Sequence, residues 1–188
     1  TNTSSRIGSA AGSAGTVVVS GAGSTWATTG TLAVGSSGQG TLTVADSGST
    51  TATGAATIGT LGTLNIGSGA GAGTFSALSL ANSGTLRFNH TGAASFSTPT
   101  SGAGAVVKDG AGTTTITGTH GYTGATTVNA GLLAVNGSIG GSVVTVGNGA
   151  SLGGTGTVGG ITTLAGATIA PGNSIGTLNV SGDISFVP

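Results

Sequence analysis

The residues Gly40-Thr41-Leu42-Thr43-Val44 alternate polar and apolar side chains, the two-residue period of a β-strand with one buried face. The pattern returns at even spacing, first as Gly62-Thr63-Leu64-Asn65-Ile66 and then as Gly84-Thr85-Leu86-Arg87-Phe88. A second short strand repeats at the same interval. Leu78-Ser79-Leu80 lies as far from Ala56-Thr57-Ile58 in the sequence as Gly62 lies from Gly40. Because turn-forming Gly, Ser, Asn and Asp bound these runs, each repeat is predicted to be a unit of short strands joined by turns.

Looser copies of the pattern lie at Gly30–Val34, Gly131–Val135 and Gly176–Val180. Two or three short strands in a period of about 22 residues are typical of one coil of a β-solenoid, whose inward side chains are buried only by neighbouring coils. The sequence therefore predicts an all-β fold, a right-handed parallel β-helix (β-solenoid) with about 22 residues per coil and roughly eight coils ~4.8 Å apart. A sandwich of antiparallel hairpins is the alternative, and the lack of regularly spaced Asn-Gly turns disfavours it.

The composition excludes several classes of function. Charged residues make up 3% of the chain and the formal net charge is zero, so no electrostatic contact with nucleic acid is expected. Cysteine is absent, which excludes disulfides and thiolate metal sites. The chain has 41 Gly, yet its mean hydropathy of +0.40 and 36% hydrophobic residues argue against disorder. Neither a membrane-spanning apolar helix nor a signal peptide is expected in this segment.

Three stretches resemble the passengers of bacterial autotransporters, the proteins of type V secretion. Gly23-Ser24-Thr25-Trp26 is similar to a Gly-Ser-x-Trp repeat of large autotransporters. The stretch from Val107 to Leu133 is similar to the autotransporter-associated β-strand repeat, with its Lys, Gly-x-Gly, Thr-rich strand and Tyr-Thr-Gly-x-Thr-x-Val-x-x-Gly-x-Leu. A third, 152–178, resembles the end of a passenger. The resemblance divides the chain into coils with the Gly-Ser-x-Trp repeat (1–104), the β-strand repeat (105–136) and C-terminal passenger coils (137–188).

The resemblance also implies a location and partners. A full-length protein of this kind carries an N-terminal signal and a C-terminal outer-membrane barrel, and we expect the passenger to be anchored at the bacterial surface through that barrel, or secreted. Its passenger crosses the outer membrane unfolded and folds coil by coil outside the cell. The expected partners are a host cell surface or extracellular matrix, protein or glycan, together with self-association at exposed solenoid ends.

Candidate chemistry is sparse in this chain. The motif around Ser174, Gly172-Asn173-Ser174-Ile175-Gly176, matches a nucleophile elbow, but no helix follows and both histidines lie upstream, so we interpret it as a coil corner. His90 and His120 are interpreted as surface turn residues, and no spacing supports a triad with Asp109. The sequence therefore predicts no catalytic residues, no metal site and no cofactor.

Two aromatic residues are weak candidates for binding a partner. Trp26 and Tyr122 are the single Trp and the single Tyr, and lone aromatics can anchor a partner at a surface. A structural role, stacking along one side of a coil, is the favoured interpretation. Thr-x-Thr pairs such as Thr41/Thr43 suggest an ice-binding face, but Thr63/Asn65 and Thr85/Arg87 break the column that such a face requires.

The function predicted from the sequence is a non-enzymatic passenger segment that acts as an adhesin or stalk and supports the folding and secretion of the passenger. The alternatives are a passenger whose protease or lipase domain lies outside this segment, or an ice-binding β-solenoid. The sequence does not separate an adhesin from a plain spacer.

Overall fold

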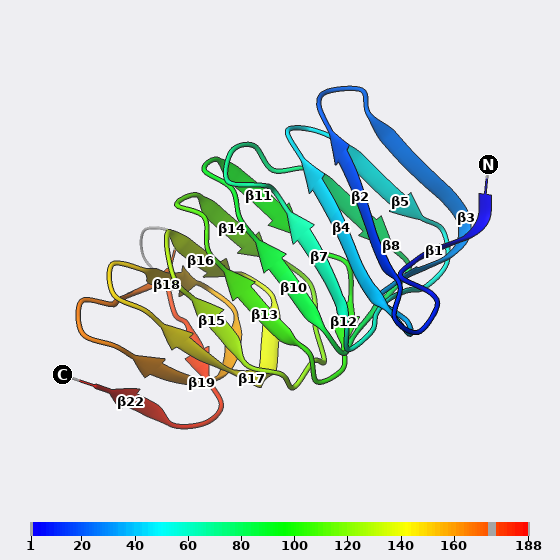
Figure 1. Ribbon diagram of the computed structural model, residues 1–188. Helices are drawn as coiled ribbons and strands as arrows, with labels where there is room; N and C mark the ends of the chain where they lie inside the picture. Colours follow the sequence, from blue (N-terminus) through cyan, green and yellow to red (C-terminus); the bar gives the residue numbers. More distant parts are fainter. Residues whose placement is uncertain (1, 173–175, 188) are drawn as a thin grey trace.

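The computed structural model describes residues 2–172 and 176–187, and all regular structure in these ranges is β-strand. The strands pair in parallel and stack into a solenoid of about eight turns, with the two termini at opposite ends of the stack (Figure 1). The predicted parallel β-helix is thereby confirmed, and the alternative of antiparallel hairpins is excluded.

Three sheets form the faces of the solenoid. The ten-stranded sheet contains β2 (Ala14–Ser20), β4 (Gln39–Ala45), β7 (Gly62–Ile66), β10 (Thr85–Phe88), β13 (Ala105–Lys108), β15 (Thr126–Val128), β17 (Ser138–Val146), β19 (Thr157–Thr163), β21 (Asn179–Val180) and β22 (Ile184–Phe186). The seven-stranded sheet contains β1 (Asn2–Ile7), β3 (Thr25–Val34), β5 (Ser49–Ala52), β6 (Ala56–Ile58), β8 (Thr74–Ala77), β9 (Leu80–Asn82) and β12 (Thr100–Ser101). The five-stranded sheet contains β11 (Ala93–Phe96), β14 (Thr113–Ile116), β16 (Leu132–Val135), β18 (Ser151–Gly154) and β20 (Thr168–Pro171).

The core is built from two inward columns of the ten-stranded sheet, in which each side chain packs on its partner in the next coil. The first column is Leu42, Leu64, Leu86, Val106, Thr126, Val144 and Ile161, and the second is Val44, Ile66, Phe88, Lys108, Val128, Val146 and Thr163. All of these side chains are buried. Because burying one Leu, Val or Ile side chain contributes about 1.5–3 kcal/mol, contacts between neighbouring coils supply the stability of the fold.

The repeat is less regular than the sequence predicts. Ala14 pairs with Gln39 and Gly40 pairs with Gly62, but Val144 pairs with Ile161, a much shorter interval along the chain. The coils therefore shorten along the chain as far as β19 and lengthen again in the last one, where Ile161 pairs with Ile184, so the period seen in the sequence describes only some of them.

One predicted pairing is wrong in detail, and two copies of the pattern lie in other sheets. The strand Ala56–Ile58 pairs with Leu80–Asn82, two positions beyond the predicted partner 78–80. The looser copies Gly30–Val34 and Gly131–Val135 lie in the seven-stranded and five-stranded sheets, apart from the three copies that stack in the ten-stranded sheet. Alternation fixes which side chains point inward, but the length of each coil decides which strand lies next to which.

Tight corners require glycine at specific positions. Gly35 has a φ of +71°, and a Cβ atom built on it would lie 2.3 Å from the Cα atom of Gly62 in the next coil. A side chain here would be strained both by its own backbone and by the neighbouring coil.

Candidate functional site

Polar side chains are buried in the interior of the solenoid along the stretch 90–142, which includes the segment similar to the autotransporter-associated repeat. Lys108 stands in an inward column between Phe88 and Val128 and is fully buried. Its ammonium group donates hydrogen bonds to the carbonyl oxygens of Gly110 and Ala130, the latter at 3.1 Å in the next coil. Burial lowers the pKa of Lys108, while the nearby Asp109 carboxylate acts in the opposite direction.

His90 is buried, which contradicts its interpretation as a surface turn residue. Its Nε2 atom lies 2.8 Å from the hydroxyl of Thr114 in the next coil, and its Nδ1 atom lies 3.0 Å from the carbonyl oxygen of Gly92. Burial lowers the pKa of His90, the Gly92 carbonyl partly offsets this, and the positive charge of Lys108 lowers the pKa further. The ring is therefore held neutral, with both nitrogen atoms bonded inside the fold.

His120 is also buried, so its interpretation as a surface turn residue is wrong as well. Its Nε2 atom lies 2.9 Å from the Thr117 carbonyl oxygen. The ring stacks on Phe96, with centroids 6.0 Å apart, and meets Tyr122 edge-on at 6.4 Å. Burial lowers the pKa of His120, and the bond to Thr117 acts against this. The imidazole belongs to an aromatic stack and does not face solvent.

Tyr122 is buried and is not a surface anchor for a partner. Its hydroxyl lies 2.9 Å from that of Thr126, which lies 2.8 Å from the hydroxyl of Ser142, and Ser142 donates to the Gly124 carbonyl oxygen at 2.7 Å. Burial raises the pKa of Tyr122, although the bonds to Thr126 and Ser142 lower it. This chain of hydroxyls joins neighbouring coils and supports the structural role that the sequence favours for this residue.

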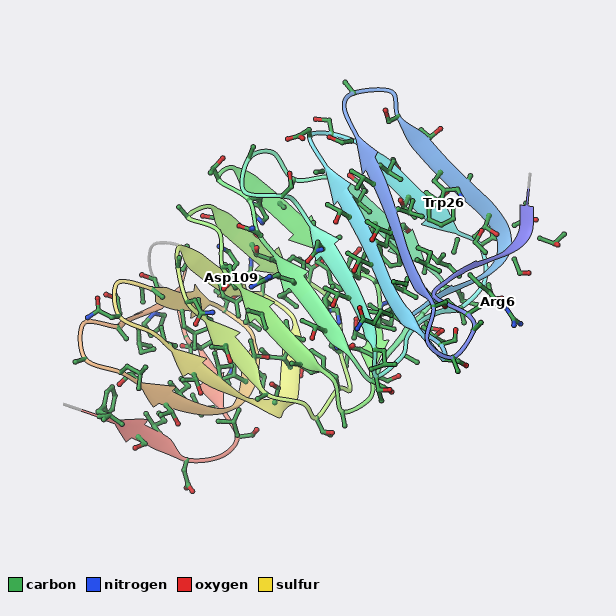
Figure 2. The ribbon with its side chains drawn as sticks, viewed as in Figure 1. Arg6, Trp26 and Asp109 are labelled. Atoms are coloured by element: carbon green, nitrogen blue, oxygen red, sulfur yellow. The ribbon has the colours of Figure 1, made fainter. Side chains whose placement is uncertain are left out.

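Trp26 is partly buried and packs against the hydrophobic core near the N-terminal end of the solenoid (Figure 2). It is in register with Thr50, which is in register with Phe75, so the three residues form one column across β3, β5 and β8. The hydroxyl of Thr50 is buried with no hydrogen-bond partner. Trp26 is the one candidate anchor that keeps part of its surface accessible.

The charged residues on the outside do not meet the histidines. Asp109 accepts hydrogen bonds on the outer face of the ten-stranded sheet from Arg87 and, at 2.6 Å, from the Asn129 amide. Within the described ranges no group of three His, Asp or Glu side chains could hold a metal ion. The predicted elbow residue Ser174 lies outside the described residues. Across the part of the chain that is described, no helix is both long and apolar enough to span a membrane.

The outer face of the ten-stranded sheet carries rows of hydroxyl side chains. Thr16, Thr41, Thr63 and Thr85 stack in register across four coils. The adjacent outward column reads Val18, Thr43, Asn65 and Arg87, so the second threonine of a Thr-x-Thr face is present in only one of these coils. The structure therefore confirms that the second threonine column, which an ice-binding face requires, is interrupted.

The buried polar residues follow from the alternation of the sequence. Phe88 points inward, and His90, two residues after it, points inward as well. The same count from Val106 places Lys108 inside. The interpretation of the histidines as surface residues rests on their turn-forming neighbours. It does not take the two-residue alternation of the preceding strand into account, and so it misses their burial.

Comparisons with known proteins match parts of this chain. The family described as passenger-associated-transport-repeat matches residues 106–135. An extracellular serine protease of Serratia marcescens is 42% identical over 92 residues, which are 49% of this chain and 9% of that protein. The chain thus spans a small part of its relative's length. No solved structure matches the chain significantly. Residues 106–135, with buried Lys108 and Tyr122, thus match the passenger-associated-transport-repeat and lie within a parallel β-solenoid.

Proposed function

We propose that this chain is a non-enzymatic, surface-exposed passenger segment that acts as a stalk and adhesive surface and supports passenger folding and secretion. The observation that carries the proposal is a passenger repeat embedded in a hydrogen-bonded solenoid, in which the ten-stranded sheet runs from β2 to β22. Such a rod is stiff, because each coil is bonded to the coils on both sides, and its length separates what it carries from the cell.

The fold also suits stepwise folding during secretion. Pairing is between neighbouring coils throughout the described ranges, so folding can begin at one end and proceed without waiting for distant segments. The absence of cysteine means that no disulfide can form before the chain has crossed a membrane. Each coil that folds outside opposes the return of the chain, so the segment itself helps to drive its export.

The adhesive surface is the outer face with its threonine rows. The hydroxyls of Thr16, Thr41, Thr63 and Thr85, repeated in four successive coils, can make many weak hydrogen bonds to a host protein or glycan, and several such contacts act together at one surface. We assign the protein to the bacterial surface or the secreted fraction, held through an outer-membrane barrel of the full-length protein. Self-association of passengers, which the sequence also predicts, is part of the proposal.

The proposal is tested with bacteria that express the full-length protein or an in-frame deletion of residues 14–171, which removes the coils from β2 to β20. Two quantities are measured: the amount of passenger accessible to added protease on intact cells, and adherence to host cells. We expect the deletion to lower both. Unchanged surface display would overturn the role in secretion, and unchanged adherence at equal display would overturn the adhesive role.

The alternative is a passenger whose catalytic domain lies elsewhere in the chain, as a protease or a lipase. The specific observation in its favour is the Serratia relative, an extracellular serine protease of which this segment matches only 9%. The purified 188-residue chain is assayed on casein and on an ester substrate. Hydrolysis that a serine-reactive inhibitor abolishes would mean that the segment itself is catalytic, which would contradict both this alternative and the non-enzymatic role.

A further inference from the structure

One face of the solenoid is interrupted between β8 and β11. In each coil the chain leaves the ten-stranded sheet and enters a second face, formed first by β5 and β8 and later by β11 and β14. β8 is the last strand of the seven-stranded sheet and β11 the first strand of the five-stranded sheet, and among the described residues no ladder joins them. Figure 1 shows the two sheets as separate groups behind the continuous ten-stranded sheet.

A change in coil length causes the interruption. Ser49 pairs with Thr74, whereas Ala93 pairs with Thr113, so the coil that ends at β8 is longer than the coil that begins at β11. Pairing between the two kinds of coil is kept as far as the corner, where the Thr91 amide donates to the Ala70 carbonyl oxygen at 2.8 Å. Beyond this corner a long coil lies on a shorter one, and the two strands no longer meet in register.

The extra residues of the long coil are held away from β11. The Ser47 amide donates to the Ala72 carbonyl oxygen at 2.8 Å, and the Gly71 amide donates to an Asp46 carboxylate oxygen at 2.9 Å. The loop before β8 is thus fixed to the preceding coil. It leaves a hollow of about 370 Å³, lined by Ser47, Ala72, Gly73, Thr74, Ala93, Ala94 and Ser95.

The chemistry of the hollow selects its ligand. The lining has no charged side chain and no large one, so it offers neither an ion pair nor a deep apolar pocket. What it offers is main chain: β11 contributes Ala93, Ala94 and Ser95 to the lining and pairs on one side only, so alternate N–H and C=O groups of its other edge lack a strand partner. An extended polypeptide is the ligand whose groups repeat with the same spacing, as in strand addition at a free sheet edge.

We propose that this hollow binds an extended, uncharged peptide segment with small side chains, which pairs its backbone with the free edge of β11 and lies against residues 72–74 on the other side. The volume lies within the range of ligand sites in proteins, and the fixed loop means that little ordering accompanies binding. The site goes beyond the stalk role, and its assay can fail while the secretion and adherence results stand.

The probe is a fluorescent hexapeptide, blocked at both ends, with the sequence of residues 112–117, because this segment forms the partner of β11 on its other side. Binding to the purified chain is followed by fluorescence anisotropy. Ala93→Trp fills the hollow from an exposed position, and we expect it to weaken binding at least tenfold. Thr168→Trp, exposed in β20, is the matched control and should leave binding unchanged.

Four results would overturn the proposal. The first is no saturable binding of the hexapeptide to the wild-type chain. The second is equal binding by the Ala93→Trp variant when its circular dichroism matches that of the wild type. The third is equal binding of a hexapeptide with proline at its third position, which lacks one backbone donor. Displacement of the probe by maltohexaose would assign the hollow to carbohydrate and would also overturn it.

Discussion

The hydroxyl of Thr50 predicts a substitution that stabilises the protein. Thr50 lies between Trp26 and Phe75 in the interior, 1% exposed, and its Oγ1 atom has no hydrogen-bond partner. A buried hydroxyl without a partner costs about 1–3 kcal/mol relative to water. Valine has nearly the same shape and suits a strand, so Thr50→Val should raise the local free energy of unfolding by about 1–3 kcal/mol.

Thr126 supplies the opposite case in the same fold. It is equally buried, but its hydroxyl joins those of Tyr122 and Ser142. Thr126→Val leaves the Tyr122 hydroxyl buried without this partner, so the same chemical change should destabilise the protein by about 1–3 kcal/mol. The two variants separate the effect of hydrogen bonding from the general effect of replacing threonine with valine.

Native-state hydrogen exchange is the appropriate assay, because a stack of coils opens locally and a single unfolding midpoint averages over it. For Thr50→Val we expect slower exchange of amides in β3, β5 and β8, by roughly 5- to 150-fold for about 1–3 kcal/mol. For Thr126→Val we expect faster exchange in β13, β15 and β17. Faster exchange around Thr50→Val would refute the reasoning, since it would mean that the hydroxyl has a partner in solution.

Three further predictions concern corners, pH and the exposed end. Gly35→Ala should destabilise the protein more than Gly12→Ala in urea unfolding, because both have positive φ but only Gly35 faces the next coil, and equal losses would contradict the steric argument. The pKa values of His90 and His120 are lowered in the fold, so their contribution to stability is complete above about pH 6.5 and is lost as the pH falls below it. Thermal unfolding from pH 7.5 to 5 should show this loss, and a double His→Gln variant should reduce it. The purified chain should self-associate with rising concentration in sedimentation velocity, and Phe186→Ser should reduce this association because Phe186 is exposed. Equal association of the variant would contradict a role for the exposed end.

The general architecture was predictable because the residues that stack are the residues that repeat. Leu42, Leu64 and Leu86 are evenly spaced in the sequence and in register in the sheet. The later coils were not predictable by the same rule. Val144 lies on Ile161, a shorter interval, and no copy of the earlier pattern marks the change. The local sequence determines which residues form a strand and which of them point inward. The number of residues in the turns determines which strand of the next coil it pairs with.

The passenger repeat could be recognised from the sequence, but not the positions of its polar groups. Lys108 and Tyr122 belong to the motif by which the repeat was recognised, and the fold places both inside. Composition assigns such residues to the surface because burying a charge or a hydroxyl is unfavourable without partners. The partners are carbonyl and hydroxyl groups of adjacent coils, so they exist only once the coils have stacked.

These buried bonds bear on a problem that the composition creates. A solenoid rich in Gly, Ala, Ser and Thr offers many nearly equivalent ways to stack one coil on the next, since small side chains fit almost any register. Three of the polar bonds join neighbouring coils: His90 to Thr114, Lys108 to the Ala130 carbonyl, and Thr126 to Ser142.

A slip by two positions keeps the apolar alternation but removes each of these partners, and every unpaired group then costs about 1–3 kcal/mol, more for the ammonium. The apolar column would tolerate such a slip. We infer that the polar residues of the passenger repeat fix the register of the coils around them. A chain that folds one coil at a time requires this at each step, because a coil stacked in the wrong register becomes the template for the next.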